Sequence, residues 1–273
     1  MKNFAPKKSL GQHFLHDKNI ARKIANEMDY TPKSVIVEIG PGTGVLTNFI
    51  LENDVLLYAY EIDDRSVDYL NERFAIESNV KFFLKKQDFL TSDLHGISKQ
   101  HNQQIQVIGN IPYYITSQIL FHLIENSQFI KRATIMMQKE LAARIKASPN
   151  SKEYGILTIA SSLFFEISGK FEIPPSCFLP PPKVMSTCLT MNFHNPFPDV
   201  SVSNKLKIIE LSKFLFNQRR KKISNSLQNY LNNKNIEISK VLANAELKKY
   251  LDLRPEDLYV QDFIILYNLI HQL

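Results

Sequence analysis

Short apolar runs alternate with stretches of helical spacing along the first half of the chain. Five runs are rich in β-branched and aromatic residues, as is typical of buried strands. Between them, apolar residues recur every three or four positions, for example at Val67, Leu70 and Phe74, which indicates amphipathic helices. This alternation predicts an α/β fold with a parallel sheet covered on both faces. The predicted strands are 34–40, 55–62, 80–84, 106–110 and 133–137.

The pattern changes in the second half of the chain. Two extended runs, 163–173 and 184–193, flank a proline-rich loop and predict a final antiparallel pair. The segment HNPFPD (194–199) is typical of a linker. Beyond it, apolar residues recur only at helical intervals. We therefore expect two domains, a sheet domain over 1–195 and a small all-α domain over 200–273.

The charge is distributed unevenly. The net charge is +6, yet residues 1–24 carry six Lys and Arg against one acid, and residues 205–222 carry seven against one, so the remainder is acidic. Two basic clusters on an acidic body favour a polyanionic partner such as nucleic acid. Two ordinary solvated surfaces are the alternative.

The cysteines and the apolar segments indicate the compartment in which the protein works. Cys177 and Cys188 are the only cysteines, with no CxxC pair and no histidine at metal-ligand spacing, so we expect free thiols and no metal site. The N-terminus lacks the apolar core of a secretory signal, and no segment has the composition of a membrane span. We expect a cytoplasmic protein, and no feature demands more than a monomer.

A glycine-rich segment, GPGTG (40–44), follows the first predicted strand. Gly40 and Gly42 fit the first two positions of the dinucleotide-binding pattern, but Val45 stands at the third. Such a loop can bring backbone N–H groups close to an adenosine-bearing ligand, although it lacks the third glycine usual for pyrophosphate binding. A structural turn without a ligand is the alternative.

Two acids mark the ends of the next two predicted strands. Glu61 can accept hydrogen bonds from both ribose hydroxyls and would repel a 2′-phosphate. Asp88 can accept a hydrogen bond from an adenine amine, with a helix cap as the alternative. A ligand with a ribose, an adenine and no required phosphate is indicated. S-adenosylmethionine fits that description better than NAD or ATP.

The tetrapeptide Asn110-Ile111-Pro112-Tyr113 follows the fourth predicted strand. The N6 amine of adenine is a poor nucleophile because its lone pair is delocalised into the ring. The Asn110 side-chain oxygen and a backbone carbonyl beside Pro112 could accept its two hydrogens and aim the lone pair at a methyl donor. Tyr113 offers a face on which the base can stack. A strand-ending turn is the alternative for this motif. Phe178 could cover the opposite face of the base, or could equally anchor the proline-rich loop in the core.

Six segments resemble the ribosomal RNA adenine N6,N6-dimethyltransferases, in that family's order and over nearly the whole chain. The last segment favours the branch that modifies the small-subunit (16S) RNA. The six are KKSLGQHFL (7–15), EIGPGTGVLT (38–47), NIPYYITS (110–117), MMQKELAARI (136–145), FLPPPKVMS (178–186) and FNQRRKKISNSL (216–227).

The resemblance implies a Rossmann-like class I methyltransferase sheet, mostly parallel with an antiparallel final strand, followed by a small all-α RNA-binding domain. It implies S-adenosyl-L-methionine as the methyl donor and no metal. The residues it assigns to the donor are His13, Leu15, Gly40, Gly42, Glu61, Asp88 and Asn110. The residues it assigns to the target base are Asn110, Pro112, Tyr113 and Phe178.

The substrate implied by the resemblance is a pair of adjacent adenosines in a hairpin near the 3′ end of 16S rRNA, in the assembling 30S subunit. The chain departs from the family's usual residues at His13, Gln87 and Tyr114, where Asn, Gly and Asn are common. The basic residues expected to contact RNA are Lys7, Lys8, Arg219, Arg220, Lys221 and Lys222.

Two alternatives remain open. A 23S rRNA adenine N6-methyltransferase of the macrolide-resistance type shares the Asn-x-Pro-Tyr motif, although the QRRKK segment (218–222) counts against it. A non-enzymatic RNA-binding assembly factor would carry the same basic clusters. The presence of Glu61, Asp88 and Asn110 together argues against a lost activity.

Overall fold

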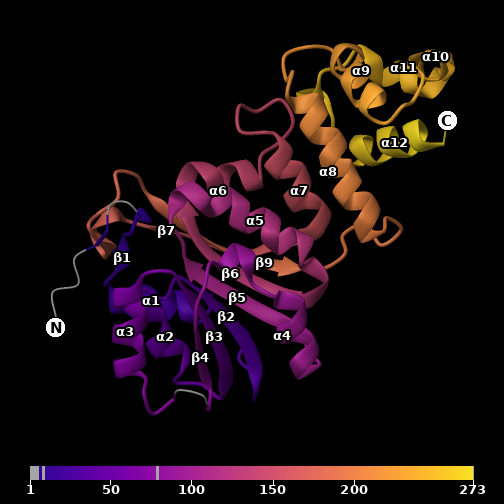
Figure 1. Cartoon of the computed structure of the whole chain (residues 1–273). Helices are drawn as coiled ribbons and strands as arrows, with labels where there is room; N and C mark the ends of the chain where they lie inside the picture. Colours follow the sequence, from indigo (N-terminus) through magenta and orange to yellow (C-terminus); the bar gives the residue numbers. More distant parts are fainter. Residues whose placement is uncertain (1–5, 8–9, 78–79, 273) are drawn as a thin grey trace. The chain divides into compact units, whose positions relative to one another are not determined.

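Two compact units make up the chain in the computed structural model (Figure 1). Unit 1 comprises Met1–Ala142 and Phe165–His194, and unit 2 comprises Ala143–Phe164 and Asn195–Leu273. The sequence pattern groups 143–164 with the sheet, whereas its packing groups this segment with the C-terminal helices. The described residues are 6–7, 10–77 and 80–272.

Unit 1 is built on a seven-stranded sheet in the order β4-β3-β2-β5-β6-β9-β7. Strands β2 to β6 pair in parallel, and β9 is antiparallel to both of its neighbours. The predicted fold class, a mostly parallel sheet with an antiparallel final strand, is confirmed. The strands are β2 (Ser34–Ile39), β3 (Val55–Glu61), β4 (Phe82–Lys86), β5 (Ile105–Asn110), β6 (Ile130–Gln138), β7 (Phe165–Ile173) and β9 (Ser186–Phe193).

Helices connect the successive parallel strands of unit 1. The strand order runs outward from β2 in one direction to β4 and in the other to β6, so right-handed connections place α2 and α3 on one face and α4 and α5 on the other. Figure 1 shows this two-sided cover. The helix α1 begins after Asp17, whose carboxylate accepts hydrogen bonds from the backbone N–H groups of Asn19 and Ile20, as expected of an N-cap. The helix that precedes β2 is α1 (Lys18–Ala25), and the connecting helices are α2 (Val45–Ile50), α3 (Asp64–Arg73), α4 (Leu94–His101) and α5 (Thr116–Glu125).

A small second sheet joins the N-terminal segment to the proline-rich loop. Strand β1 (Phe14–Leu15) pairs antiparallel with β8 (Phe178–Leu179), with Leu15 opposite Phe178. Two-residue strands carry no periodicity, so the sequence pattern did not predict this pairing. It holds the segment before α1 beside the carboxyl-terminal ends of the main strands.

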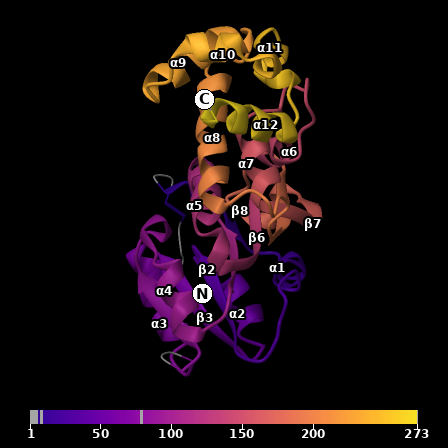
Figure 2. The same ribbon diagram turned by 90° about the vertical axis from the view of Figure 1, so that its right-hand side faces the viewer.

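Unit 2 is helical. Its core contains Ile208, Leu211 and Leu215 of α8 and Leu227 and Leu231 of α9, all buried at the helical intervals seen in the sequence. Figure 2 shows the later helices gathered around one end of α8. No helix within 10–77 or 80–272 is long and apolar enough to cross a bilayer. The helices are α6 (Lys139–Ile145), which spans the division between the units, α7 (Ile156–Phe164), α8 (Val202–Phe216), α9 (Ile223–Asn233), α10 (Ile238–Ala243), α11 (Ala245–Leu251) and α12 (Val260–His271).

Candidate active site

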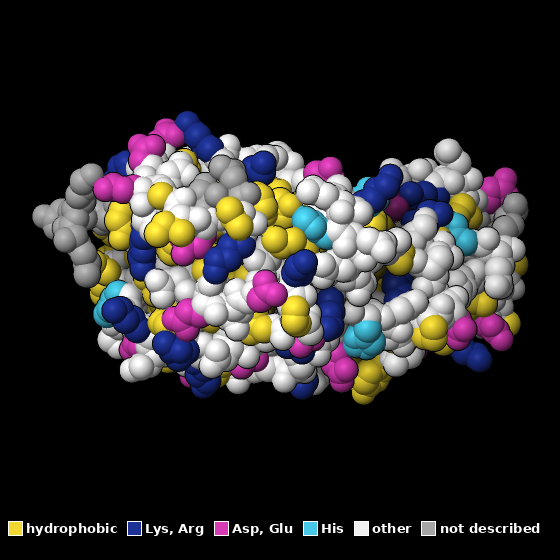
Figure 3. All heavy atoms as spheres, turned by 90° about the horizontal axis from the view of Figure 1, so that it is seen from below, with side chains coloured by type: hydrophobic (Ala, Val, Ile, Leu, Met, Phe, Trp, Pro, Cys, Tyr) yellow, Lys and Arg dark blue, Asp and Glu magenta, His cyan; other side chains and the backbone are white. Residues whose placement is uncertain are grey.

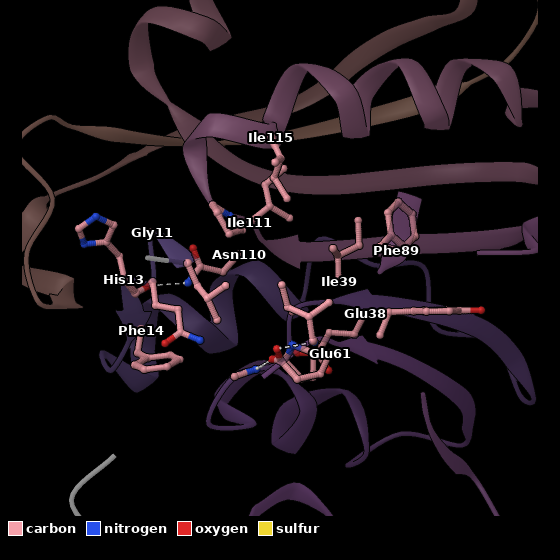
Figure 4. A pocket seen from close by; sticks show the side chains of 18 of the residues that line it. Gly11, His13, Phe14, Glu38, Ile39, Glu61, Phe89, Asn110, Ile111 and Ile115 are labelled. Carbon is pink, nitrogen blue, oxygen red and sulfur yellow. Dashed lines mark hydrogen bonds between the residues drawn. The ribbon is translucent and has the colours of Figure 1, made fainter. Parts of the chain in front are cut away.

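A cavity lies in unit 1 where the carboxyl-terminal ends of β2, β3 and β5 meet. This is the point at which the strand order reverses, and ligands of open parallel sheets bind there. Figure 4 shows the side chains that point into the cavity. The predicted residues that line it are His13, Leu15, Gly40, Gly42, Glu61, Asp88, Asn110, Pro112 and Tyr113.

The glycine loop owes its shape to the backbone and to close packing. Gly40, Gly42 and Gly44 have φ values of +61°, +57° and +72°, a region that disfavours side chains. A Cβ on Gly42 would lie 2.8 Å from the Phe14 ring, and one on Gly44 would lie 2.7 Å from Phe74. The neighbourhood of Gly40 is open by comparison, since the nearest atom to its Cβ position is the Asn110 carbonyl oxygen at 3.9 Å. Gly40 is therefore the loop position at which a ligand can approach the backbone most closely.

Glu61, at the end of β3, is held by three backbone N–H groups. Its Oε2 accepts from Gly42 at 3.0 Å, and its Oε1 accepts from Ile62 at 2.8 Å and Asp63 at 2.9 Å. An ionised carboxylate has about four acceptor positions, so roughly one remains on Oε2 for a ligand. Burial raises the pKa of Glu61, and these backbone hydrogen bonds oppose that rise. Glu61 both fixes the glycine loop and presents an acceptor to the cavity.

Glu38 is a second buried acid in the cavity wall, and the sequence reading gave it no role. Its only signal was an acid within the otherwise apolar strand β2. Its Oε2 accepts a hydrogen bond from the Thr47 hydroxyl at 2.7 Å. Burial raises the pKa of Glu38 to about 8, and the nearby Glu61 adds to that rise. Glu38 is therefore mostly protonated and uncharged at neutral pH, and it places a buried carboxylic acid beside Glu61 in this wall of the cavity.

Asp88 lies at the cavity edge after β4 and is exposed. Its Oδ1 caps the short helical turn Phe89–Thr91 by accepting from the Leu90 N–H at 2.9 Å. The cap alternative is thus realised, but it occupies only one oxygen. Within the described part of the chain, no hydrogen bond is formed by Oδ2, which leaves it available for an adenine amine. Phe89, which the sequence reading missed, lines the same side.

Asn110, the last residue of β5, has a fixed amide orientation. Its Nδ2 donates a hydrogen bond to the His13 carbonyl oxygen at 2.9 Å (Figure 4). A carbonyl can only accept, so the nitrogen must face His13 and the Oδ1 is left for the cavity. The motif therefore presents a free amide oxygen at the place where the sequence predicts it.

The backbone carbonyl beside Pro112 can also be identified. Pro112 has a φ of −59° and its own carbonyl oxygen accepts from Ile115 N–H and the Thr116 hydroxyl, both at 3.3 Å. The carbonyl of Ile111 precedes the proline ring and takes part in no hydrogen bond among the residues described. The second acceptor expected from the motif is thus Ile111 O, on the peptide that Pro112 constrains.

Tyr113 is held from two sides. Its hydroxyl hydrogen-bonds to the Ser186 hydroxyl at 2.6 Å, and burial raises its pKa. The His13 ring stacks on it at a centroid distance of 5.7 Å and an interplanar angle of 23°. The His13 Nδ1 in turn contacts the Pro180 carbonyl oxygen at 2.7 Å. The His13 ring therefore contacts Tyr113 and the proline-rich loop, and its backbone carbonyl fixes Asn110.

Phe178 does not line the cavity. Its side chain is 2% exposed and lies in the hydrophobic core with Leu15, Cys177 and Cys188. Both cysteines are free and buried. The antiparallel pairing of β8 with β1 turns the Phe178 ring inward, so the structure matches the alternative in which Phe178 anchors the loop. Stacking of this ring on a target base is not supported in the conformation described.

The N-terminal basic segment is attached to Asp63. Lys7 Nζ and Gln12 Nε2 donate to its two carboxylate oxygens at 3.0 and 3.1 Å, and Arg65 forms an ion pair with it at 2.7 Å. The Arg65 hydrogen bond is the main cause of the lowered pKa of Asp63. Lys7, expected to contact RNA, thus already has a carboxylate partner. Lys8 lies outside the described residues.

The C-terminal basic cluster divides into two kinds of side chain. Arg219 donates to Glu256 Oε2 at 2.6 Å and to the carbonyl oxygens of Lys152 at 2.7 Å and Ser151 at 2.6 Å, so its guanidinium is used within unit 2. The expected phosphate contact of Arg219 is therefore corrected to a structural role. Lys222 forms an exposed ion pair with Asp252 at 2.7 Å. On the face drawn in Figure 3, Lys and Arg side chains are interspersed with Asp and Glu. Of residues 219–222, Arg220 and Lys221 are exposed and have no such partner among the described residues.

The fold and the site define a class I methyltransferase: a parallel sheet with an antiparallel last strand, a glycine loop at the switch point, and acids at the ends of the next two strands. The sequence model of the family "Ribosomal RNA adenine dimethylase" matches residues 3–261. The chain belongs to this family. Within the described residues, no cluster of three His, Cys, Asp or Glu side chains could hold a metal ion.

Curated relatives and solved structures agree with this family. The chain is 38% identical to the ribosomal RNA small subunit methyltransferase A of Mycoplasma mobile, over 96% of both chains, and 37% identical to the protein of that name from Bacteroides thetaiotaomicron, over 100% of this chain and 96% of the relative.

Two crystal structures share the fold. A dimethyladenosine transferase from Plasmodium falciparum matches with a TM-score of 0.75 and 24% identity, over 93% of this chain and 96% of its own. The 23S rRNA methyltransferase ErmE matches with a TM-score of 0.61 and 22% identity, over 95% of this chain and all of its own. At these identities the matches show the architecture and do not distinguish the substrates.

Proposed function

We propose that this protein transfers methyl groups from S-adenosyl-L-methionine to the N6 amines of two adjacent adenosines near the 3′ end of 16S rRNA, in the assembling small ribosomal subunit. Membership of the adenine dimethylase family supports the reaction, and the small-subunit methyltransferases among its relatives support the substrate. One observation carries the proposal: Asn110 Oδ1 and Ile111 O are both left available beside a cavity with the acceptors a nucleoside requires.

The chain's part in the reaction is to position an amine. An adenine that enters the cavity can donate its two N6 hydrogens to Asn110 Oδ1 and Ile111 O. These bonds favour a pyramidal nitrogen, which localises the lone pair and makes it a better nucleophile. No strong base is needed before attack, because the proton becomes acidic only as the new N–C bond forms. The aromatic ring of Tyr113 supplies a stacking surface at the same end of the cavity.

The cavity residues also fit the methyl donor. The remaining acceptor position on Glu61 suits a ribose hydroxyl, Asp88 Oδ2 suits an adenine amine, and the open backbone at Gly40 allows close approach. The carboxylates of Glu61 and Asp88 favour a cationic ligand over a phosphate-bearing one. When bound, S-adenosylmethionine supplies an electrophilic methyl group on a sulfonium centre. The target base must leave its own stack to reach this site.

The RNA partner is proposed to contact Arg220 and Lys221, which are exposed and form no ion pair among the described residues. Nothing in the site requires a second copy of the chain, and we propose that it acts as a monomer in the cytoplasm, on particles in which 16S rRNA is being assembled. Arg220 and Lys221 belong to unit 2. RNA binding is therefore proposed for the helical unit and methyl transfer for the sheet unit.

Methyl transfer to defined RNAs tests the substrate directly. The protein is incubated with labelled S-adenosylmethionine and unmethylated 30S particles, free 16S RNA or 23S RNA, and the nucleosides are identified by mass spectrometry. Dimethyladenosine at two adjacent positions of 16S rRNA is the expected product. Modification of 23S RNA alone would favour the macrolide-resistance activity, and RNA binding without any transfer would favour an assembly factor.

The role of Asn110 is tested with a matched asparagine. Asn110→Ala removes the amide oxygen and is expected to slow transfer by about 100-fold or more, on the scale seen when one positioned hydrogen-bonding group is lost from an active site. Asn126 makes an equivalent bond, from Nδ2 to the His122 carbonyl oxygen at 2.9 Å, away from the cavity. Asn126→Ala should keep near wild-type turnover. If Asn110→Ala did so as well, the catalytic assignment would be wrong.

A further inference from the structure

Tyr113 and Tyr114 are neighbours in one helical turn, but their side chains have different surroundings. Tyr113 is partly buried, with its hydroxyl on Ser186 and its ring against His13. Tyr114 also lines the cavity, yet its side chain is 63% exposed. It therefore lies where the cavity opens to solvent. The motif thus places one tyrosine side chain, Tyr113, inside the cavity and the next, Tyr114, at its opening.

The backbone at Gly11 lies against one side of the Tyr114 ring. A Cβ at Gly11 would lie 3.3 Å from both Cδ1 and Cε1 of Tyr114, and Gly11 has a φ of +58°, so the backbone of the N-terminal segment comes close to the ring. The 63% exposure of Tyr114 leaves the rest of the ring accessible to a ligand at the mouth of the cavity. The ring is thus braced from one side and open on another.

An RNA substrate places a base at this position. The adenine that enters the cavity is joined through its sugar and phosphate to a neighbour, and this neighbour must remain at the cavity mouth. Unpaired bases bind proteins chiefly by stacking on exposed aromatic side chains. Tyr114 has the required exposure, and it lies three residues after Ile111, whose carbonyl oxygen is proposed to hold the target amine.

We propose that Tyr114 stacks on the base adjacent to the target adenine and so positions the pair for successive methylation. The inference rests on the proposed function, in which that adjacent base is the second adenine. Tyr114 is a positioning residue, since it contacts the neighbour and not the reacting nitrogen. In this arrangement Tyr114 binds one adenine while the other adenine occupies the cavity.

A cycle of two changes, one in the protein and one in the RNA, tests this pairing. Tyr114→Ala and wild-type protein are compared on 30S particles reconstituted with 16S RNA that carries either both adenines or one adenine beside an abasic nucleotide. Stacking of one base on an aromatic ring predicts that Tyr114→Ala raises KM for the two-adenine particle by about tenfold. The variant and the wild type should then differ little on the particle with the abasic nucleotide, which has no base to stack. Tyr114→Phe keeps the ring and should behave as wild type.

Tyr259 provides a matched control, because it is also 63% exposed but belongs to unit 2. Tyr259→Ala can weaken RNA binding in general, but its effect should be the same for both particles. Equal effects of Tyr114→Ala on the two particles, or no effect on either, would overturn the inference while leaving the proposed function intact. Absence of methyl transfer by the wild type would instead refute the proposed function. Binding of S-adenosylmethionine, measured by calorimetry, should be unchanged in Tyr114→Ala.

Discussion

At the scale of single residues, two side chains that line the cavity, Glu61 and Asn110, also fix the backbone around it. Glu61 fixes the glycine loop through Gly42, and Asn110 fixes the N-terminal segment through His13. Each keeps one acceptor free because its other atoms are already bonded. A site built in this way is formed before the ligand arrives, which lowers the entropy lost on binding.

Glu38 makes the stability of unit 1 depend on pH. Its pKa is about 8 in the folded chain, against 4.5 for an ordinary glutamate. Between these two values the unfolded chain releases the proton and the folded chain retains it, so stability falls as pH rises, by about 1.4 kcal/mol per pH unit at most. Below pH 4.5 the contribution is fully present. Glu38→Gln is expected to remove this loss, since the amide stays neutral and still accepts from Thr47.

Hydrogen exchange of the β2 amides at pH 5, 6, 7 and 8 measures the effect on unit 1. The advantage of Glu38→Gln over wild type should grow steadily from pH 5 to pH 8. Some pH dependence should persist in the variant, because burial also raises the pKa of Glu61. Glu166→Gln, at an exposed position of β7, tests whether removal of any carboxylate charge gives the same change. A constant difference between Glu38→Gln and wild type at all pH values would contradict the argument.

At the scale of elements, the turn between α8 and α9 combines two functions that the sequence cannot separate. Four consecutive basic residues at 219–222 look alike in the chain. In the fold, Arg219 bonds to Glu256 and to two carbonyl oxygens, whereas Arg220 and Lys221 remain exposed. The first side chain holds the turn in place, and the other two are presented to solvent.

Substitutions in this turn should therefore differ in what they change. Arg219→Ala is expected to destabilise unit 2 by roughly 2 kcal/mol, because it leaves a partly buried carboxylate and two carbonyl oxygens unpaired. The double variant Arg220→Ala, Lys221→Ala should keep the thermal stability and instead lower the slope of log RNA affinity against log salt by about 0.7–0.9 per cation. Thermal melts and filter binding at several salt concentrations measure the two effects. An unchanged slope in the double variant would show that Arg220 and Lys221 belong to an ordinary solvated surface and do not contact RNA phosphates.

The sequence predicts an element well where a hydrophobic pattern extends over several residues. It predicts poorly the features that depend on contacts between residues distant in the chain. The strands β2, β3 and β5 were predicted within a residue of their observed bounds, because their apolar runs are buried on both faces. The helix α7 was missed, since its sequence joins the apolar run that continues into β7. The burial of Phe178 and the pairing of Arg219 depend on residues distant in the chain, and no local pattern reports them. Glu38 was visible as an acid in a buried strand, but its role depends on the cavity beside it.

At the scale of the whole molecule, the helical unit is assembled from two separate parts of the chain. The Tyr154 hydroxyl donates to the Leu258 carbonyl oxygen at 2.5 Å, and the buried Lys205 Nζ donates to the Leu163 carbonyl oxygen at 2.9 Å. Residues 143–164 thus contribute to a core that the sequence pattern assigns to 200–273 alone. Because the inserted segment lies between β6 and β7, the chain must complete both parts before this unit can fold.

A fragment of residues 195–273 is consequently expected not to fold as an independent domain. It lacks Tyr154, Ile159 and Leu163, which are buried in the whole chain, and it would expose the surfaces they cover. Circular dichroism should show a broad, non-cooperative thermal transition for the fragment. A second polypeptide, in which residues 143–164 are joined to 195–273 by a flexible glycine-serine linker, should regain a cooperative transition, because the linker restores the packing of α7 on α8 at a modest entropic cost. A version of that fusion with Tyr154→Ala should lose part of the gain. Cooperative unfolding of 195–273 alone would show instead that the C-terminal helices are sufficient, and that the single boundary drawn from the sequence describes the folding unit.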